Sequence, residues 1–178
     1  MRTLLKWLGY LVLALALLLA AGWLLPSRYA AQRSVVINAP PDKVWPLVAA
    51  PKAWTQWTVW NRRDPAMQVT YSGPDSGPGA GWSWVSKSEG IGHMQFTKAD
   101  PPVKLDYTIG FGENDRQGTG GGSIILDPEG AQTKVTWTMS GNAGNNPVMR
   151  WFGLFIDKLI GPDFEAGLAN LKALAEKG

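Results

Sequence analysis

The chain has 178 residues, a length that favours one domain. It contains 10 Trp, 1 His and 0 Cys. Because it has no cysteine, it can form no disulfide, thiolate nucleophile or cysteine-based metal site. The formal net charge is +3. When Arg2 and Lys6 are left out, 15 of the 17 basic residues remain against 14 acidic residues, and the net charge is +1. Arg62-Arg63 is the only adjacent basic pair, so the basic groove that nucleic acid needs is missing and we expect no nucleic-acid partner.

The first expected element is a membrane-spanning helix. Residues 7–25 carry no charge, and at about 1.5 Å per residue they span roughly 28 Å, close to the roughly 30 Å of a bilayer's hydrocarbon core. Tyr10 and Trp23 lie near the ends, where aromatic side chains favour the membrane interface. The apolar run is longer than that of a secretory signal and no good cleavage site follows it. We therefore expect an uncleaved anchor over residues 1–26, with a cleaved signal peptide as the alternative.

The charges that flank this helix are nearly balanced, with Arg2 and Lys6 before it and Arg28 and Arg33 after it. A very short basic N-terminus usually stays in the cytoplasm, and long downstream domains cross largely regardless of their charge. We therefore expect a single-pass membrane protein whose domain lies outside the cytoplasm, on the periplasmic side of a Gram-negative cell. Residues 27–32 are expected to form a linker and residues 33–178 the domain.

The domain is expected to start with one strand and two short helices. Residues 33–39 favour a strand that ends at Pro40-Pro41. Pro41 suits a first helical turn, and Pro51 ends this helix and starts a second one over residues 51–57.

Six segments with a period of two residues follow, which is typical of strands with one apolar face. In one of them Leu105, Tyr107 and Ile109 alternate with polar side chains. The connecting segments are rich in glycine and proline, which favour turns. The six segments are residues 67–73, 81–89, 93–98, 103–110, 122–127 and 133–141.

From Pro147 the sequence predicts a long amphipathic helix that is kinked or restarted at Gly161-Pro162. A sheet with one apolar face must cover that face, and this helix is the only long element available. The sequence therefore predicts an α+β fold in which a curved antiparallel sheet of about seven strands is wrapped on a long C-terminal helix.

This order of elements resembles the SRPBCC superfamily of START-like, helix-grip proteins, described as polyketide cyclase/dehydrase and lipid transport. The resemblance covers about residues 33–176 and implies an apolar cavity between the sheet and the long helix, with the segment after the short helices near its mouth. The superfamily includes lipid carriers, aromatase/cyclases, hydrolases and chaperone cofactors, so the fold does not determine the function. The segments that carry the resemblance are residues 33–48, 54–60, 69–84, 133–141 and 161–176.

Three of the tryptophans, Trp54, Trp57 and Trp60, recur at intervals of three, which places them along one side of a short helix. Core packing, a cavity wall and a membrane-surface contact are the three interpretations. The charged residues that follow Trp60 directly favour the mouth of a cavity for Trp57 and Trp60. The candidate ligand-binding residues are Trp57, Trp60, Trp84, Phe96, Tyr107, Trp137 and Phe152.

Catalytic signals are sparse. His93 falls on the polar face of its strand, which argues against a nucleophile–base pair, and the scattered carboxylates predict no metal site and no cofactor. Arg63 and Asp64 are expected to pair with each other at the surface, and Tyr71 and Tyr107 to point inward. The sequence does not specify an oligomeric state.

We therefore expect a non-catalytic, membrane-tethered domain that binds an apolar or amphipathic, lipid-like small molecule in its interior. One alternative is a cyclase/dehydrase-like enzyme that uses Tyr107 or a carboxylate in the same cavity. The other is an accessory protein that acts through its outer surface.

Overall fold

The computed structural model describes residues 2–115 and 118–177. Their elements in chain order are α1 (Arg2–Gly22), β1 (Arg28–Ile37), α2 (Pro41–Ala49), α3 (Pro51–Trp57), α4 (Trp60–Arg63), β2 (Gln68–Ser72), β3 (Gly81–Ser86), β4 (Gly90–Asp100), β5 (Lys104–Phe111), a 3-10 turn η1 (Glu113–Asp115), β6 (Gly118–Glu129), β7 (Gln132–Asn142), α5 (Pro147–Gly153) and α6 (Ile156–Ala175).

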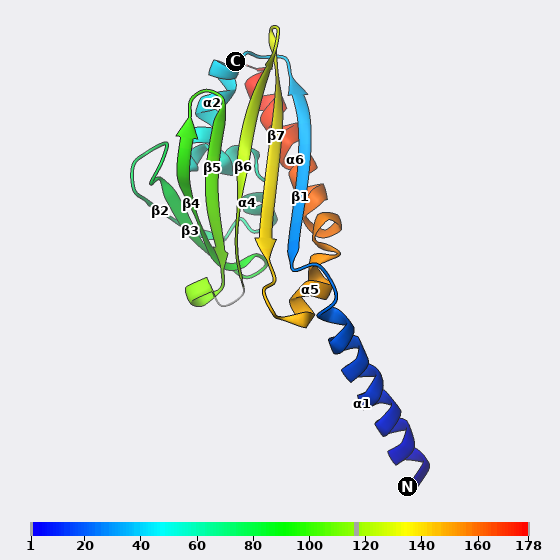
Figure 1. The fold of residues 1–178 in the computed structure, drawn as a ribbon. Helices are drawn as coiled ribbons and strands as arrows, with labels where there is room; N and C mark the ends of the chain where they lie inside the picture. Colours follow the sequence, from blue (N-terminus) through cyan, green and yellow to red (C-terminus); the bar gives the residue numbers. More distant parts are fainter. Residues whose placement is uncertain (1, 116–117, 178) are drawn as a thin grey trace.

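The seven strands form one antiparallel sheet in the order β1-β7-β6-β5-β4-β3-β2. Strands β2 to β7 pair in sequence order, and β1 joins the far side of β7. The sheet curves around α6, which packs along β1, while α2 and α3 lie behind the sheet in the view of Figure 1. This arrangement confirms the predicted α+β fold, a curved sheet wrapped on a long C-terminal helix.

The strand β1 begins earlier than expected. It pairs with β7 from Arg28↔Asn142 to Ile37↔Thr133, so residues 28–32 belong to the sheet and the expected linker over residues 27–32 is wrong. Two alanines stand in this segment, and alanine is depleted in strands, so the sequence pattern there is weak. The long neighbouring strand β7 supplies the pairing that extends β1.

The C-terminal segment is divided at a different place than the sequence suggests. The helix α6 continues through Gly161 and Pro162, and the break falls at residues 154–155, between α5 and α6. Phe164, Leu168 and Leu171 of α6 are almost fully buried. Most helical stability in proteins comes from such packing, and here it outweighs the cost of an internal proline.

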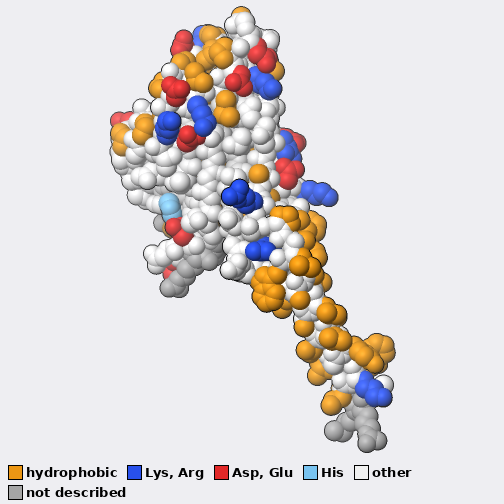
Figure 2. Space-filling model, in the orientation of Figure 1, with side chains coloured by type: hydrophobic (Ala, Val, Ile, Leu, Met, Phe, Trp, Pro, Cys, Tyr) orange, Lys and Arg blue, Asp and Glu red, His pale blue; other side chains and the backbone are white. Residues whose placement is uncertain are grey.

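The helix α1 extends away from the domain, at the opposite end of the molecule from the C-terminus (Figure 1). Its segment Thr3–Gly22 has a mean hydropathy of 2.2, and residues 3–20 are exposed, so by length and composition it is able to cross a membrane. Space-filling atoms show it as an apolar rod attached to one end of the domain (Figure 2).

Candidate functional site

The space between the sheet and α6 is filled by aromatic side chains, which we call the aromatic cluster. In it, Trp54 and Trp57 of α3 lie with ring centroids 4.7 Å apart, and each meets Trp137 of β7, at 5.5 and 5.1 Å. Trp137 in turn stacks on Phe164 of α6 with centroids 3.8 Å apart and an interplanar angle of 2°. The members are Trp54, Trp57, Trp60, Trp82, Phe96, Tyr107, Trp137 and Phe164.

Trp54 and Trp57 are held by the end of the helix before them. Both rings are at most 1% exposed, and their indole N–H groups donate to the carbonyls of Val48 and Leu47, at 2.7 and 3.0 Å. These carbonyls belong to the last turn of α2, where no intrahelical partner is available. The spacing of three therefore serves two purposes: it fills the interior with rings and satisfies the carbonyl end of α2.

Tyr107 and Trp137 form a buried polar pair inside the cluster. The Trp137 indole N–H donates to the Tyr107 hydroxyl at 3.0 Å, and that hydroxyl donates to the Thr138 carbonyl at 2.8 Å. Burial raises the pKa of Tyr107 above its ordinary value. The hydroxyl is therefore protonated at neutral pH, and its hydrogen bonds are directed at the protein's own atoms.

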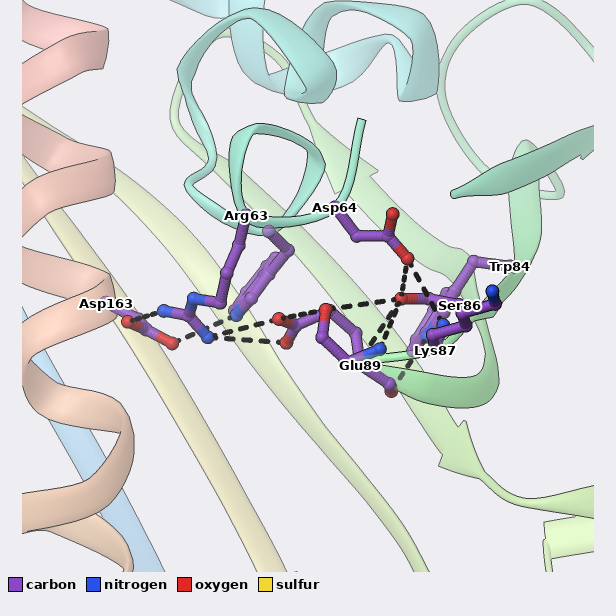
Figure 3. A network of polar contacts seen from close by, with 9 residues as sticks. Arg63, Asp64, Trp84, Ser86, Lys87, Glu89 and Asp163 are labelled. Atoms are coloured by element: carbon purple, nitrogen blue, oxygen red, sulfur yellow. Dashed lines mark hydrogen bonds and ion pairs between the residues drawn. The ribbon is translucent and has the colours of Figure 1, made fainter. Parts of the chain in front are cut away.

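One end of the cluster is covered by polar contacts, which Figure 3 shows from close by. We call Trp60, Arg63, Glu89 and Asp163 the polar lid. The Trp60 indole N–H donates to Asp163 Oδ2 at 3.1 Å, while Arg63 donates to Asp163 Oδ1 at 2.5 Å and to Glu89 Oε1 at 3.3 Å. The lid joins α4, α6 and the turn between β3 and β4. The Arg63 side chain is 46% exposed, whereas the Asp163 and Glu89 side chains are 19% and 15% exposed.

Asp64 does not pair with Arg63, so the expected surface pair between these neighbours is wrong. Asp64 ends α4 with an extended backbone, and its carboxylate accepts hydrogen bonds from Ser86 Oγ at 2.7 Å and from the Lys87 backbone at 3.2 Å. The hydrogen bond from Ser86 holds the pKa of Asp64 below its ordinary value. Arg63 thus fastens α4 to α6 and to the turn between β3 and β4, and Asp64 fastens it to the end of β3 and the same turn (Figure 3).

Five of the seven predicted ligand-binding residues lie in the aromatic cluster: Trp57, Trp60, Phe96, Tyr107 and Trp137. Trp84 lies beside it, 9% exposed, with its ring edge-on to Phe111 at 6.0 Å. Phe152 is different, because it is 48% exposed on α5 and lies outside the interior. The sequence predicts one long helix from Pro147 that would place Phe152 against the sheet. In the structure Phe152 belongs to α5, which is separate from the covering helix α6.

Tyr71 was expected to point inward but is 38% exposed. Its strand, β2, is an edge strand of the sheet. Met67 and Val69, on the same side of this segment, are partly buried against the core, so Tyr71 lies at the margin of that face. Sequence reasoning also missed the lid carboxylates Glu89 and Asp163. Glu89 follows a strand without any special signal, and Asp163 resembles an ordinary helical residue 100 positions away from its partner Arg63.

A hollow among the described residues lies away from this interior. It has a volume of about 830 Å³ and opens on the outer side of the sheet, near the end that carries α1. His93 borders it, with Nδ1 3.6 Å from Asp115 Oδ1. Within residues 2–115 and 118–177, no group of three or more histidine, aspartate or glutamate side chains is arranged to hold a metal ion.

A curved seven-stranded sheet that grips one long helix around an aromatic interior defines this protein as a helix-grip domain. The model of the family "Polyketide cyclase / dehydrase and lipid transport" matches residues 29–176, and the chain belongs to that family. The match includes residues 29–32 and so agrees with the early start of β1.

Several solved structures share the fold at low sequence identity. A norcoclaurine synthase mutant from Thalictrum flavum, in complex with a transition-state analogue, matches with a TM-score of 0.64 and 14% identity over 84% of this chain and 95% of that chain. Ara h 8.0201 matches with a TM-score of 0.60 and 13% identity, over 85% and 99% of the two chains.

Protein CV1439 from Chromobacterium violaceum matches with a TM-score of 0.57 and 18% identity, over 83% and 97% of the two chains. No curated protein matches the sequence. At such identities the likeness shows the fold alone.

Proposed function

We propose that this chain is a membrane-tethered, non-catalytic domain that binds an apolar or amphipathic, lipid-like small molecule against its aromatic cluster. Membership of a family described by lipid transport is consistent with this class of ligand. Binding sites of this kind combine apolar and aromatic walls with a few polar groups at one side.

The observation that supports binding is the polar closure at one end of the cluster. Trp60 is only partly buried there, and Arg63 is nearly half exposed where it bridges Asp163 and Glu89. Exposed ion pairs typically contribute about 0–1 kcal/mol. Separating α4 from α6 at the lid therefore costs less than opening the apolar packing around Trp137, and it would uncover aromatic rings to an arriving molecule.

A second candidate function is an accessory role exerted through the outer surface. It is favoured by the filled interior: Trp54, Trp57, Phe96, Trp137 and Phe164 are each at most 1% exposed, and Trp137 and Phe164 stack closely. A ligand in the interior therefore requires some of these rings to shift. If they do not shift, the domain has no room inside and acts from outside.

An enzymatic role has less support. The Tyr107 hydroxyl is engaged by Thr138 and Trp137, and its raised pKa makes it a poor acid near neutral pH. The carboxylates nearest the cluster, Asp163 and Glu89, are both paired with Arg63.

The test of binding uses the full chain, purified from its host in detergent and examined by native mass spectrometry. We expect a complex with one lipid-like molecule, or a one-to-one complex after incubation with oleic acid. A dibromostearic acid probe should then quench the tryptophan fluorescence, because bromine quenches indoles on contact.

The matched variants are Arg63→Gln, which removes the centre of the lid, and Lys52→Gln, which removes an exposed pair with Asp75 elsewhere on the surface. We expect Arg63→Gln to accelerate quenching several-fold and Lys52→Gln to leave it unchanged. A folded protein that forms no one-to-one complex and shows no saturable quenching would reject interior binding and support the surface role.

The tether itself is proposed from α1, which is apolar and exposed over residues 3–20. We propose that it remains attached, with the domain outside the cytoplasm. Fusion of alkaline phosphatase, which is active only outside the cytoplasm, after Gly178 should give activity, while a green fluorescent protein fusion should be dark. The opposite pair of results reverses the orientation, and a shortened protein in the soluble fraction contradicts the anchor.

A further inference from the structure

The end of the domain next to α1 carries an exposed apolar surface, which we call the apolar base. Val148 and Phe152 of α5 are 57% and 48% exposed. Leu154 and Phe155 of the connection and Leu159 of α6 are 48%, 52% and 53% exposed. Exposed apolar groups gathered in one place usually mark a contact with a partner or a membrane.

The apolar base lies beside the last turn of α1. The Trp151 indole N–H donates to the Leu18 carbonyl at 2.9 Å, and the Trp23 indole N–H donates to the Asn145 carbonyl at 3.0 Å. Gly22 lies so close to Pro147 that a Cβ on Gly22 would come within 2.7 Å of the Pro147 carbonyl oxygen. The two helices therefore touch from Leu18 to the end of α1.

This contact also sets the depth of the base relative to α1. Leu18 is four residues before Gly22, which at about 1.5 Å per residue is about 6 Å along the axis. Interfacial amphipathic helices bury their apolar face about 5–10 Å into the boundary between headgroups and acyl chains. If α1 spans a membrane, α5 lies at that depth.

Arg150 fastens the base to the chain that leaves α1. Its Nη1 donates to the carbonyls of Trp23 and Leu25, at 2.6 and 3.1 Å. A base held in this way does not turn away from the membrane independently of α1.

The charges around the base suit a membrane surface. Residues 143–156 contain no acidic side chain and one basic side chain, Arg150. Asp157, at the start of α6, pairs with Arg33 at 2.7 Å, which compensates its negative charge. Trp23 and Trp151 have the amphipathic rings that favour the interface between water and lipid.

We propose that the apolar base is a second membrane contact, inserted at the boundary between headgroups and acyl chains of the bilayer that α1 spans. This proposal rests on the membrane tether proposed above. The hydrophobic atoms of α1 continue onto the adjoining end of the domain in Figure 2, so the two apolar surfaces form one continuous contact. The domain would thereby stand in a fixed orientation on the membrane, with the far end of the sheet directed into water.

The experiment uses the full chain, which contains 0 Cys and therefore accepts single labelling sites. Phe152→Cys and Phe155→Cys carry a nitroxide in the base, Leu15→Cys carries one in α1, and Val103→Cys carries one in the turn at the far end of the sheet. All four positions are at least 42% exposed, so labels there should leave the fold intact, as circular dichroism would verify.

The proteins are placed in phosphatidylcholine/phosphatidylglycerol nanodiscs. The accessibility of each label to oxygen, which enters lipid, and to a water-soluble nickel chelate is then measured by power saturation. We expect the Leu15 label to be protected most strongly from the chelate, the Phe152 and Phe155 labels to be protected severalfold relative to Val103, and the Val103 label to be freely accessible.

Two results overturn the proposal. Labels at Phe152 and Phe155 that are as accessible to the chelate as the label at Val103, while Leu15 is protected, would show that the base stays in water above an intact anchor. Dipolar broadening between Phe155 labels that disappears on dilution with unlabelled protein would show that a second copy covers the base. A water-accessible Leu15 label would instead contradict the anchor itself.

Discussion

Trp57 and Trp60 are three residues apart, and both present a ring edge to Trp137, with centroids 5.1 and 5.7 Å away and an interplanar angle of 75° in each case. Their indole partners differ. Trp57 is fully buried and donates to a backbone carbonyl of α2, whereas Trp60 is partly buried and donates to the Asp163 side chain. The aromatic cluster therefore has an inner part whose indoles are fixed by the backbone and an outer end that is fixed by side chains able to move.

The largest effect should come from removing the helix that both parts pack against. A chain that ends at Gly161 loses Phe164, Leu168 and Leu171, which are at most 2% exposed. We expect no cooperative unfolding transition by circular dichroism in detergent, with the full chain as the control. A cooperative transition in the shortened chain would contradict the role of α6 as the cover of the sheet.

Trp137→Ala should strongly destabilise the inner part. The ring is 1% exposed, stacks on Phe164, and its loss leaves a cavity next to Tyr107. Changes from Phe or Trp to Ala in a core cost about 3–5 kcal/mol, a large share of the roughly 5–15 kcal/mol that stabilises a domain. Denaturant unfolding measures this loss, and a cost near that of a surface substitution would show that the interior adapts around a missing ring.

Tyr107 should make the inner part sensitive to alkali. Burial disfavours the phenolate, so the pKa of the folded state lies above the unfolded value near 10.0. The stability that the neutral Tyr107 hydroxyl contributes is complete below about pH 10. It is lost as the pH rises toward the folded pKa, because between the two pKa values only the unfolded chain releases the proton.

We expect Tyr107→Phe to cost about 1–3 kcal/mol near neutral pH, since it leaves the buried Trp137 N–H without its partner. The same variant should lose part of the alkaline decline in stability. Tyr71→Phe, at an exposed ring, is the control. An unchanged alkaline decline in Tyr107→Phe would assign the effect to another tyrosine.

The smallest effect on stability is expected at the outer end. Trp60→Ala should cost about 1 kcal/mol, as typical substitutions do, and should weaken binding of the brominated fatty acid. Melting temperature and quenching are measured on the same samples as Trp137→Ala. If Trp60→Ala is as destabilising as Trp137→Ala, the ring belongs to the core; if neither stability nor quenching changes, a membrane-surface role for Trp60 is favoured.

The sequence alone was sufficient for the architecture, because periodicity reports which face of each element is apolar. Leu105, Tyr107 and Ile109 alternate in β5, and all three are buried. Phe164, Leu168 and Leu171 repeat at helical spacing and cover the sheet. The same reasoning failed where the local pattern is weak, as in residues 28–32, which pair with β7 despite their alanines.

The tertiary structure alone decided how the tryptophans are used. Spacing placed Trp54, Trp57 and Trp60 on one side of one short helix, which is wrong for Trp60, because α3 ends at Trp57 and Trp60 begins α4. It also did not indicate that Trp54 and Trp57 would bind the carbonyl end of α2. Nor did the spacing indicate that Arg63 would form its ion pair with Asp163 of α6 and not with its neighbour Asp64. A hydrogen bond or ion pair depends on where two distant segments meet, and periodicity carries no information about that meeting because it describes one segment at a time.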